Sequence, residues 1–366
     1  MTPLWFLLFS GELKAQFGLG LYIDIILGVM VIVSLITRRV KVSRTGFSKV
    51  KNLSILLLPF ISYLAVNVLI LNGSALKLLI DTSFYTFLML CAFLFVESGI
   101  TVNRLVLLFI VMSFVVCGFS VFSNFLGGRV LIEGQSTMVG SYHKIGLASA
   151  CSIFLVFYSK TISTRWKLTV ILYFMVVVLF SRHLYSYMVM FLFLLIVSRK
   201  NWIKFAILSV LVFVFLRDYI ASEAIFFDKF KLYQELFSLK DSARLNMWNY
   251  VAQEFIKVPI VGLGYGNFSF QIFRHPHNIL FQVLIELGLL GIIIFVITSI
   301  TVFRNVYWKW VDKRLIILLW IYGGYALVSG DIGEHRVFVT VFFIVYFSNG
   351  KSFNRISRNT SISLAN

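Results

Sequence analysis

Charge is scarce in this sequence, and negative charge is scarcer still. Asp and Glu supply 15 of the 366 residues, and charged residues together make up 13%, against about 25% in soluble domains. Apolar residues account for 60%, and the mean hydropathy is +0.92. This composition excludes a globular enzyme with a water-facing shell, because a soluble core could not bury so much apolar surface.

The sequence also lacks the patterns of a disulfide framework, a metal site and a cleaved signal peptide. Cys91, Cys117 and Cys151 lie inside apolar runs without a CxxC spacing, so neither paired thiols nor a metal is indicated. The first apolar run, Leu4 to Phe9, is short and no small-residue cleavage site follows it. We therefore expect no signal peptide to be removed.

Apolar runs long enough to cross a bilayer are frequent. A hydrocarbon core of about 30 Å requires about 20 helical residues. Runs of that size cover approximately 17–36, 53–71, 78–96, 105–126 and 279–299, and shorter ones cover 145–158, 168–181, 184–198, 203–216, 315–329 and 337–348. The spanning elements must be helices, because lipid offers no partner to unpaired backbone groups. The sequence predicts an all-α, polytopic membrane protein with about 11 spans (about 10–12).

The positive charges indicate how these spans are oriented. The net charge of +18 would suggest nucleic acid in a soluble protein, but short cytoplasmic loops of membrane proteins also collect Lys and Arg. With the 38–52 loop inside, the short loops and tail on that side hold 20 Lys and Arg, and the opposite side holds 6 outside its one long segment. We expect membrane lipids as partners and no nucleic acid.

The chain is thereby divided into four parts, and the side on which residues 1–16 lie is left open. They are an N-terminal transmembrane bundle (1–216), a long exterior loop with short helices (217–278), C-terminal transmembrane helices (279–348) and a polar cytoplasmic tail (349–366).

The long loop contains two predicted helices. Residues 228–239 place apolar side chains at helical spacing, which is typical of an amphipathic helix on a membrane surface. A second helix begins at Asp241 or Ser242 and is ended by Pro259. Arg244 and Trp248 share one of its faces. Arg244 either contacts a substrate or only extends to lipid headgroups.

Two motifs follow this helix. Gly262 to Gly266 (GLGYG) permits a tight turn whose amides can bind an oxyanion, but it fits neither the dinucleotide fingerprint nor the P-loop, and an ordinary loop stays open. Arg274 to Asn278 (RHPHN) stands directly before the span that begins at Ile279. No HExxH or acidic pair accompanies these histidines, so a metal is not favoured.

Histidines and cations collect on the exterior side. All five histidines map there, and so do Arg129, Lys144, Arg182, Arg217 and Arg336. Histidine is a common general base, and guanidinium groups bind phosphate in a planar fork. The pattern favours a phosphate-bearing substrate, with anionic headgroups as the alternative. Asp24, Asp81 and Glu286 lie within spans and are expected to face the bundle interior, which leaves a proton-coupled transporter possible.

Residues 242–291 resemble the signature region of the bacterial O-antigen ligase and polymerase superfamily. An Arg-x-x-x-Trp helix leads to a Pro-x-x-Gly-x-Gly loop, and His277-Asn278 precedes a helix carrying Glu-Leu-Gly-Leu. The Ser181-Arg182 pair also resembles a family motif, which often continues with glycine where this chain has His183.

The resemblance implies a GT-C-like membrane glycosyltransferase that uses a lipid-linked sugar donor and needs no cofactor or metal. It implies that His277, or His275 beside it, takes the proton of an acceptor hydroxyl, while Arg182 and Arg244 stabilise the departing polyprenyl diphosphate. The remaining candidate substrate contacts are Arg129, Arg217, Trp248, Gly264, Gly266, Arg274, His275 and Asn278.

Three functions follow as hypotheses. We favour a polymerase that joins undecaprenyl-diphosphate-linked oligosaccharide repeats into O-antigen or capsular polysaccharide at the bacterial inner membrane, with a chain-length regulator and a flippase as partners. The alternatives are an O-antigen ligase, which transfers the glycan to lipid A core in lipopolysaccharide, and a flippase or transporter for the same lipid-linked glycan.

Overall fold

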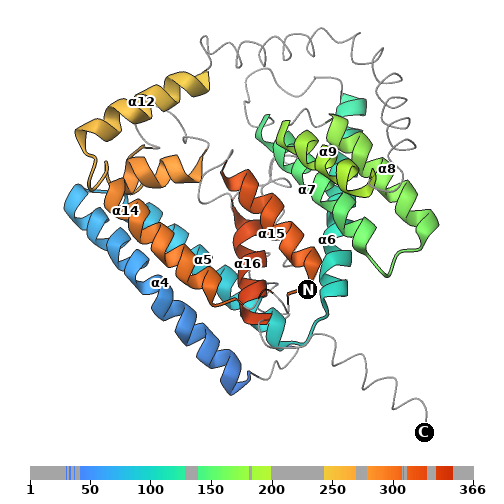
Figure 1. Cartoon of the computed structure of the whole chain (residues 1–366), viewed down its shortest axis with the longest axis horizontal. Helices are drawn as coiled ribbons and strands as arrows, with labels where there is room; N and C mark the ends of the chain where they lie inside the picture. The colour runs from blue at the N-terminus through green and yellow to red at the C-terminus, as the bar shows by residue number, and fades with distance from the viewer. Residues whose placement is uncertain are drawn as a thin grey trace.

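The computed structural model describes residues 30, 33, 37, 42–127, 139–180, 184–198, 243–268, 278–306, 308, 311–327 and 335–348. Within these residues all regular structure is helical, and Figure 1 shows the ten labelled helices. They are α4 (Arg44–Leu71), α5 (Ala75–Glu97), α6 (Val102–Gly127), α7 (Val139–Tyr158), α8 (Thr164–Phe180), α9 (Leu184–Ser198), α12 (Ala243–Lys257), α14 (Ile279–Arg304), α15 (Lys313–Ala326) and α16 (Arg336–Ser348).

Three of these helices, α4, α5 and α14, are long and apolar enough to cross a membrane. Shorter apolar stretches lie in α6, α7, α9 and α16. The predicted all-helical membrane fold is therefore confirmed for the part of the chain that the structure describes. The count of about 11 spans stays a prediction, because 203–216 and most of 17–36 lie outside the described residues.

The start of α4 differs from the prediction. The helix begins at Arg44, where Ser43 accepts a hydrogen bond from the amide of Gly46 as the N-cap. The basic residues from Arg44 to Lys51, expected in the 38–52 loop, therefore lie on the first turns of α4. Helix propensity extends the helix beyond the apolar run, because Lys and Arg are good helix formers.

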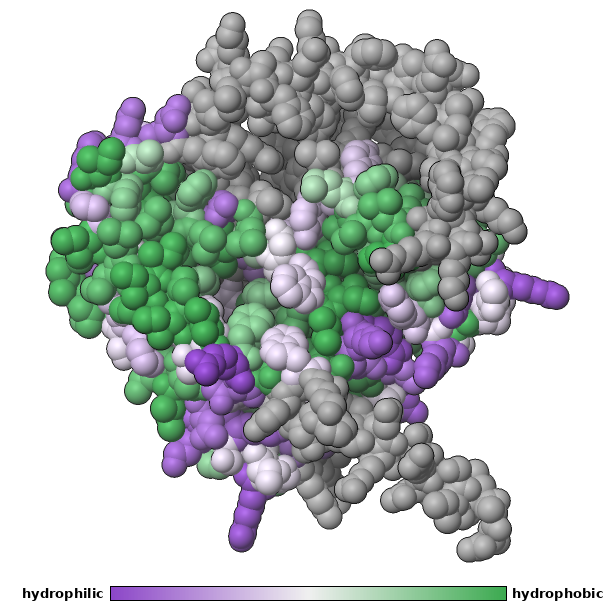
Figure 2. All heavy atoms as spheres, in the orientation of Figure 1, coloured by the Kyte–Doolittle hydropathy of each residue, from purple (hydrophilic) through white to green (hydrophobic). Residues whose placement is uncertain are grey.

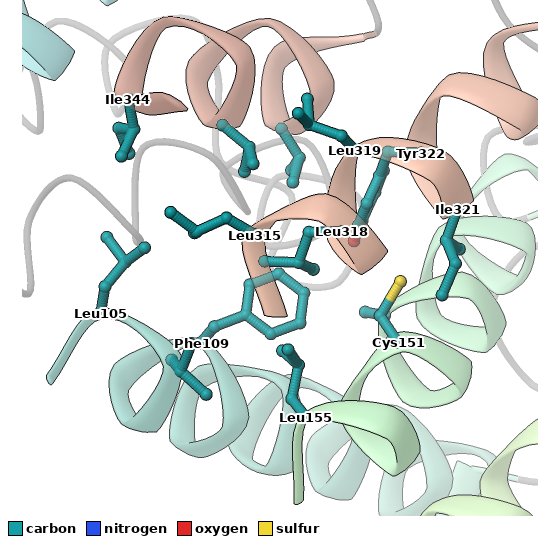
Figure 3. Packing of buried hydrophobic residues seen from close by; sticks show 14 of the residues in the cluster. Leu105, Phe109, Cys151, Leu155, Leu315, Leu318, Leu319, Ile321, Tyr322 and Ile344 are labelled. Atoms are coloured by element: carbon teal, nitrogen blue, oxygen red, sulfur yellow. The ribbon is translucent and has the colours of Figure 1, made fainter. Parts of the chain in front are cut away.

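The main apolar core lies where α6, α7, α15 and α16 meet. Phe109 on α6, Cys151 and Leu155 on α7 and Leu318 on α15 point toward one another (Figure 3). All four are completely or almost completely buried. The three cysteines are buried and carry free thiols.

A second body consists of α4, α5, α12 and α14. Helix α14 packs against α4 and α12, and α16 packs against α5, which joins this body to the main core (Figure 1). Helix α12 runs to Lys257, directly before Val258 and Pro259, and the predicted stop at the proline is confirmed.

Helix α14 is not the single continuous span predicted at 279–299. Its backbone breaks at Gly288, where φ is 69°, and the ribbon of α14 changes direction in Figure 1. The first segment runs from Ile279 to the break, and the second segment runs alongside α4. Hydropathy alone could not reveal this break, because both segments are apolar.

Candidate functional site

The loop after α12 completes the broken backbone of α14. In an unbroken helix the amides of Leu289 and Leu290 would donate to the carbonyls of residues 285 and 286. Here they donate instead to Pro259 (2.9 Å) and Ile260 (3.1 Å). The loop thus supplies the missing acceptors from residues about 30 positions earlier in the chain.

The carbonyls released by the break are satisfied in the same way. The amide of Leu263 donates to the carbonyl of Ile285 (2.9 Å), and the amide of Gly264 donates to that of Glu286 (3.0 Å). The hydroxyl of Tyr63 on α4 donates to the carbonyl of Leu287 (2.7 Å). A broken helix in a transporter typically offers such carbonyls to an ion, whereas here each of the three has a protein partner.

Two glycines make this close approach possible. A Cβ on Gly262 would lie 2.5 Å from the carbonyl carbon of Glu286, and a Cβ on Gly288 would overlap the carbonyl oxygen of Ile260. Both residues also have positive φ, which favours glycine. The Pro-x-x-Gly-x-Gly loop and the Glu-Leu-Gly motif are therefore two halves of one structural unit, which we call the α14 junction (residues 259–264 and 285–290).

Side chains of α4 and α5 hold the loop in place. Asn67 donates to the carbonyl of Val261 (2.9 Å) and accepts from the amide of Tyr265 (2.8 Å). The amide of Ser74 donates to the carbonyl of Tyr265 (2.8 Å). Gly266 packs against Ser74 and Lys77, to which a Cβ would come within 3.0 Å. The structure gives Gly264 and Gly266 a packing role, and their contact with substrate stays a prediction.

A polar cluster lies beneath the loop, between α5 and α14. Glu286 is 1% exposed, and its carboxylate lies 3.9 Å from the ammonium of Lys77. Lys77 also lies 5.4 Å from the ring centroid of Tyr265, whose hydroxyl donates to Asp81 (2.6 Å). The expectation that Asp81 and Glu286 face the bundle interior is confirmed for Glu286, and Asp81 is partly buried with its carboxylate toward the loop.

The hydroxyl of Tyr265 stays protonated at neutral pH. Burial, and then the neighbouring Asp81 carboxylate, raise the pKa of this phenol well above its ordinary value. A protonated phenol can donate to Asp81, so the loop is tied to α5 by a charge-assisted hydrogen bond.

Asn278 connects the start of α14 to the end of α15. Its side-chain oxygen accepts from the amides of Leu280 (2.8 Å) and Phe281 (3.1 Å), as an N-cap does. Its side-chain nitrogen donates to the carbonyl of Leu327 (2.6 Å), directly after α15. The predicted substrate-binding residue is thus an anchor between two helix ends, and its contact with substrate stays a prediction.

Two residues that the sequence predicts on the exterior side lie near the same helix ends. His335 precedes α16 and is buried, with its ring 6.3 Å from that of Tyr325 on α15. The guanidinium of Arg336 lies 4.8 Å from the ring centroid of Phe84 on α5, which is a cation–π contact.

The other predicted site side chains lie outside the described residues, so the structure does not test their grouping. They are Arg129, Arg182, Arg217, Arg274, His275 and His277, and also Arg244 and Trp248, whose backbone alone is described in α12.

Sequence reasoning missed Tyr63, Asn67 and Lys77, which position the loop. All three stand within or at the edge of apolar runs. A polar group in a span needs a partner, and this signal could have identified Asn67.

The matched part of the chain contains the α14 junction. The family model described as O-antigen ligase matches residues 130–296. The match supports the resemblance of this region to the O-antigen ligase and polymerase superfamily. None of the curated proteins compared with the chain matches it. Together with the apolar helices, this match supports a membrane-embedded protein.

The matched region runs from before α7 into the second segment of α14. It includes α12, the glycine loop and the break at Gly288. The O-antigen ligase and polymerase resemblance read from residues 242–291 is confirmed.

Proposed function

We propose that the protein is a membrane glycosyltransferase that polymerises undecaprenyl-diphosphate-linked oligosaccharide repeats on the outer face of the bacterial inner membrane. The family match carries this proposal, because residues 130–296 contain Arg182, Arg244 and His277, to which we assign the chemistry. Hydrogen bonds outside the α14 junction support it as well: the amide of Ser74, the N-cap of α5, donates to Tyr265 in the glycine loop, and Asn278 donates to Leu327 after α15.

In the proposed reaction His277 accepts a proton from an acceptor sugar hydroxyl. The hydroxyl oxygen forms a bond to the anomeric carbon of the donor as the bond from that carbon to the diphosphate breaks. Arg182 and Arg244 bind the diphosphate and stabilise the negative charge that it carries away. An ordinary histidine, with a pKa of about 6.5, is mostly neutral at pH 7 and can act as this base.

The proposed orientation places the 217–278 loop outside and the tail from 349 in the cytoplasm, in a GT-C-like arrangement. The product is O-antigen or capsular polysaccharide, and the proposed protein partners are a flippase and a chain-length regulator.

An O-antigen ligase is the second candidate, and the description of the matching family favours it. A ligase would transfer the finished glycan from the same carrier to lipid A core. Deleting the protein in a host with lipid A distinguishes the two functions. Single repeats attached to the core indicate a lost polymerase, and a core without glycan indicates a lost ligase. Lipid-linked repeats trapped on the cytoplasmic leaflet would contradict both.

The base assignment is tested by His277→Ala. We expect this variant to insert into the membrane at the wild-type level and to form no polymer. Normal glycan chain lengths would reject His277 as the base.

The diphosphate assignment is tested at Arg244. We expect Arg244→Ala to lose activity and Arg244→Lys to recover only part of it, because lysine lacks the planar fork of guanidinium. Full recovery by lysine would show that a point charge is sufficient.

A further inference from the structure

Helix α12 has three different faces. It is not one of the three described helices that are long and apolar enough to span a membrane. Val251 and Phe255 pack against Ile285 and the glycine loop in one small apolar cluster. Asn249, Gln253 and Lys257 form an exposed polar stripe at i, i+4, i+8 spacing. Between these two faces a third stripe is exposed but apolar.

The third stripe begins with Ala252 and Ile256 and continues into the turn after the helix. Ile256 is 75% exposed and Ile260 is 64% exposed. At 100° per residue, Ile256 points about 60° away from the centre of the polar stripe. Lys257 forms an ion pair with Glu254 (2.6 Å), which keeps both charges away from Ile256.

The apolar stripe continues onto the surface of the spanning helices. The carbonyl of Ile260 accepts from the amide of Leu290 on α14, and Leu290 and its neighbour Leu289 are exposed. On α4, Leu69 is 80% exposed and Ile70 is 71% exposed. Figure 2 shows an extended apolar surface on this side of the molecule, with hydrophilic atoms at its upper and lower ends.

The backbone contacts also fix the depth of this surface. Asn67 donates to the carbonyl of Val261 and stands four residues before Leu71, the last residue of α4. At 1.5 Å per residue, Val261 lies about 6 Å inside the end of that span. Interfacial helices bury their apolar faces about 5–10 Å into a leaflet.

We propose that α12 and the turn 258–261 form an interfacial contact surface that inserts Ile256 and Ile260 among the lipid acyl chains of the leaflet at which α4 ends. Acyl chains are the occupant because the surface is continuous with the exposed apolar faces of α4 and α14. The polar stripe then faces water. This contact fixes the depth of the α14 junction in the bilayer, since Pro259 and Ile260 carry the carbonyls that complete α14.

Nitroxide labels on the full-length protein test this proposal in bilayers of phosphatidylethanolamine and phosphatidylglycerol. The labelled variants are Ile256→Cys and Ile260→Cys, with Gln253→Cys on the polar stripe as the matched control. The native cysteines are buried, so the unsubstituted protein serves as the labelling blank.

We expect labels at 256 and 260 to collide frequently with oxygen and to lose collisions with the water-soluble reagent NiEDDA, whereas the label at 253 shows the reverse. Equal access of NiEDDA to all three labels would overturn the proposal. Immobile labels at 256 and 260 that neither reagent reaches would also overturn it, because they would indicate a protein partner.

Discussion

Around α7, buried contacts are made by apolar side chains such as Phe109, Cys151 and Leu318, whereas at the α14 junction they are made by backbone amides and carbonyls. Apolar side chains exchange for others of similar volume at small cost. Backbone groups cannot be exchanged, and their approach depends on glycine at 262 and 288. The stability of the junction should therefore be sensitive to a single added carbon atom, whereas the main core should tolerate the exchange of side chains of similar volume.

The largest effect is expected for Gly288→Ala. The added Cβ would overlap the carbonyl oxygen of Ile260, and the residue has a positive φ. We expect a loss of about 3 kcal/mol or more in the free energy of unfolding, measured by thermal unfolding in detergent. Gly118→Ala on α6 is the control, because its Cβ would lie 3.3 Å from the hydroxyl of Tyr173. Equal melting temperatures for Gly288→Ala and wild type would contradict the account of the junction.

The next largest effect concerns the ion pair beneath the loop. Lys77→Met leaves the buried Glu286 carboxylate without this cation, and removing one member of a buried pair costs about 3 kcal/mol. The double variant Lys77→Met/Glu286→Gln should be more stable than Lys77→Met alone, because no carboxylate is then left to be neutralised. A double-mutant cycle measures this coupling. Strictly additive losses would show that the two charges do not interact.

A smaller loss is expected for Asn67→Leu. This change removes the hydrogen bonds to Val261 and Tyr265, and unpaired buried groups cost about 1–3 kcal/mol. Asn52→Leu, at an exposed position of the same helix, should change little. Chemical unfolding followed by tryptophan fluorescence compares the two variants, and similar losses for both would indicate a general effect of leucine.

The smallest effect is expected in the main core. Leu318→Met conserves volume at a completely buried position of α15 and should cost less than about 1.5 kcal/mol. The same melting assay measures it. A loss as large as that of Gly288→Ala would remove the contrast between the two regions.

Local sequence was sufficient to predict most of the helices. Apolar run length located α4, α5 and α14, and Pro259 located the end of α12. The cost of charge in lipid correctly placed Glu286 in the interior. These predictions depend only on neighbouring residues, which is why they did not need the fold.

The α14 junction could not be predicted in this way. The break at Gly288 depends on carbonyls supplied by Pro259 and Ile260, and the sequence from Ile279 to Arg304 contains no proline that would mark it. Likewise Asn67 has partners 194 and 198 residues away. At the candidate site, the roles of Arg182, Arg244 and His277 stay predictions. The family match supports the region in which these three residues lie.

The two hydrogen bonds of Asn67 can form only late in biosynthesis. Tyr265 follows Asn67 by 198 residues, and a ribosome that adds about 5–20 residues per second needs roughly 10–40 s to make them. During that interval α4 is already synthesised, while the partners of its buried amide do not yet exist. A chaperone or insertase that shields the amide of a nascent α4 would therefore act before α14 is made, and chains truncated before residue 265 should be targets for membrane quality control.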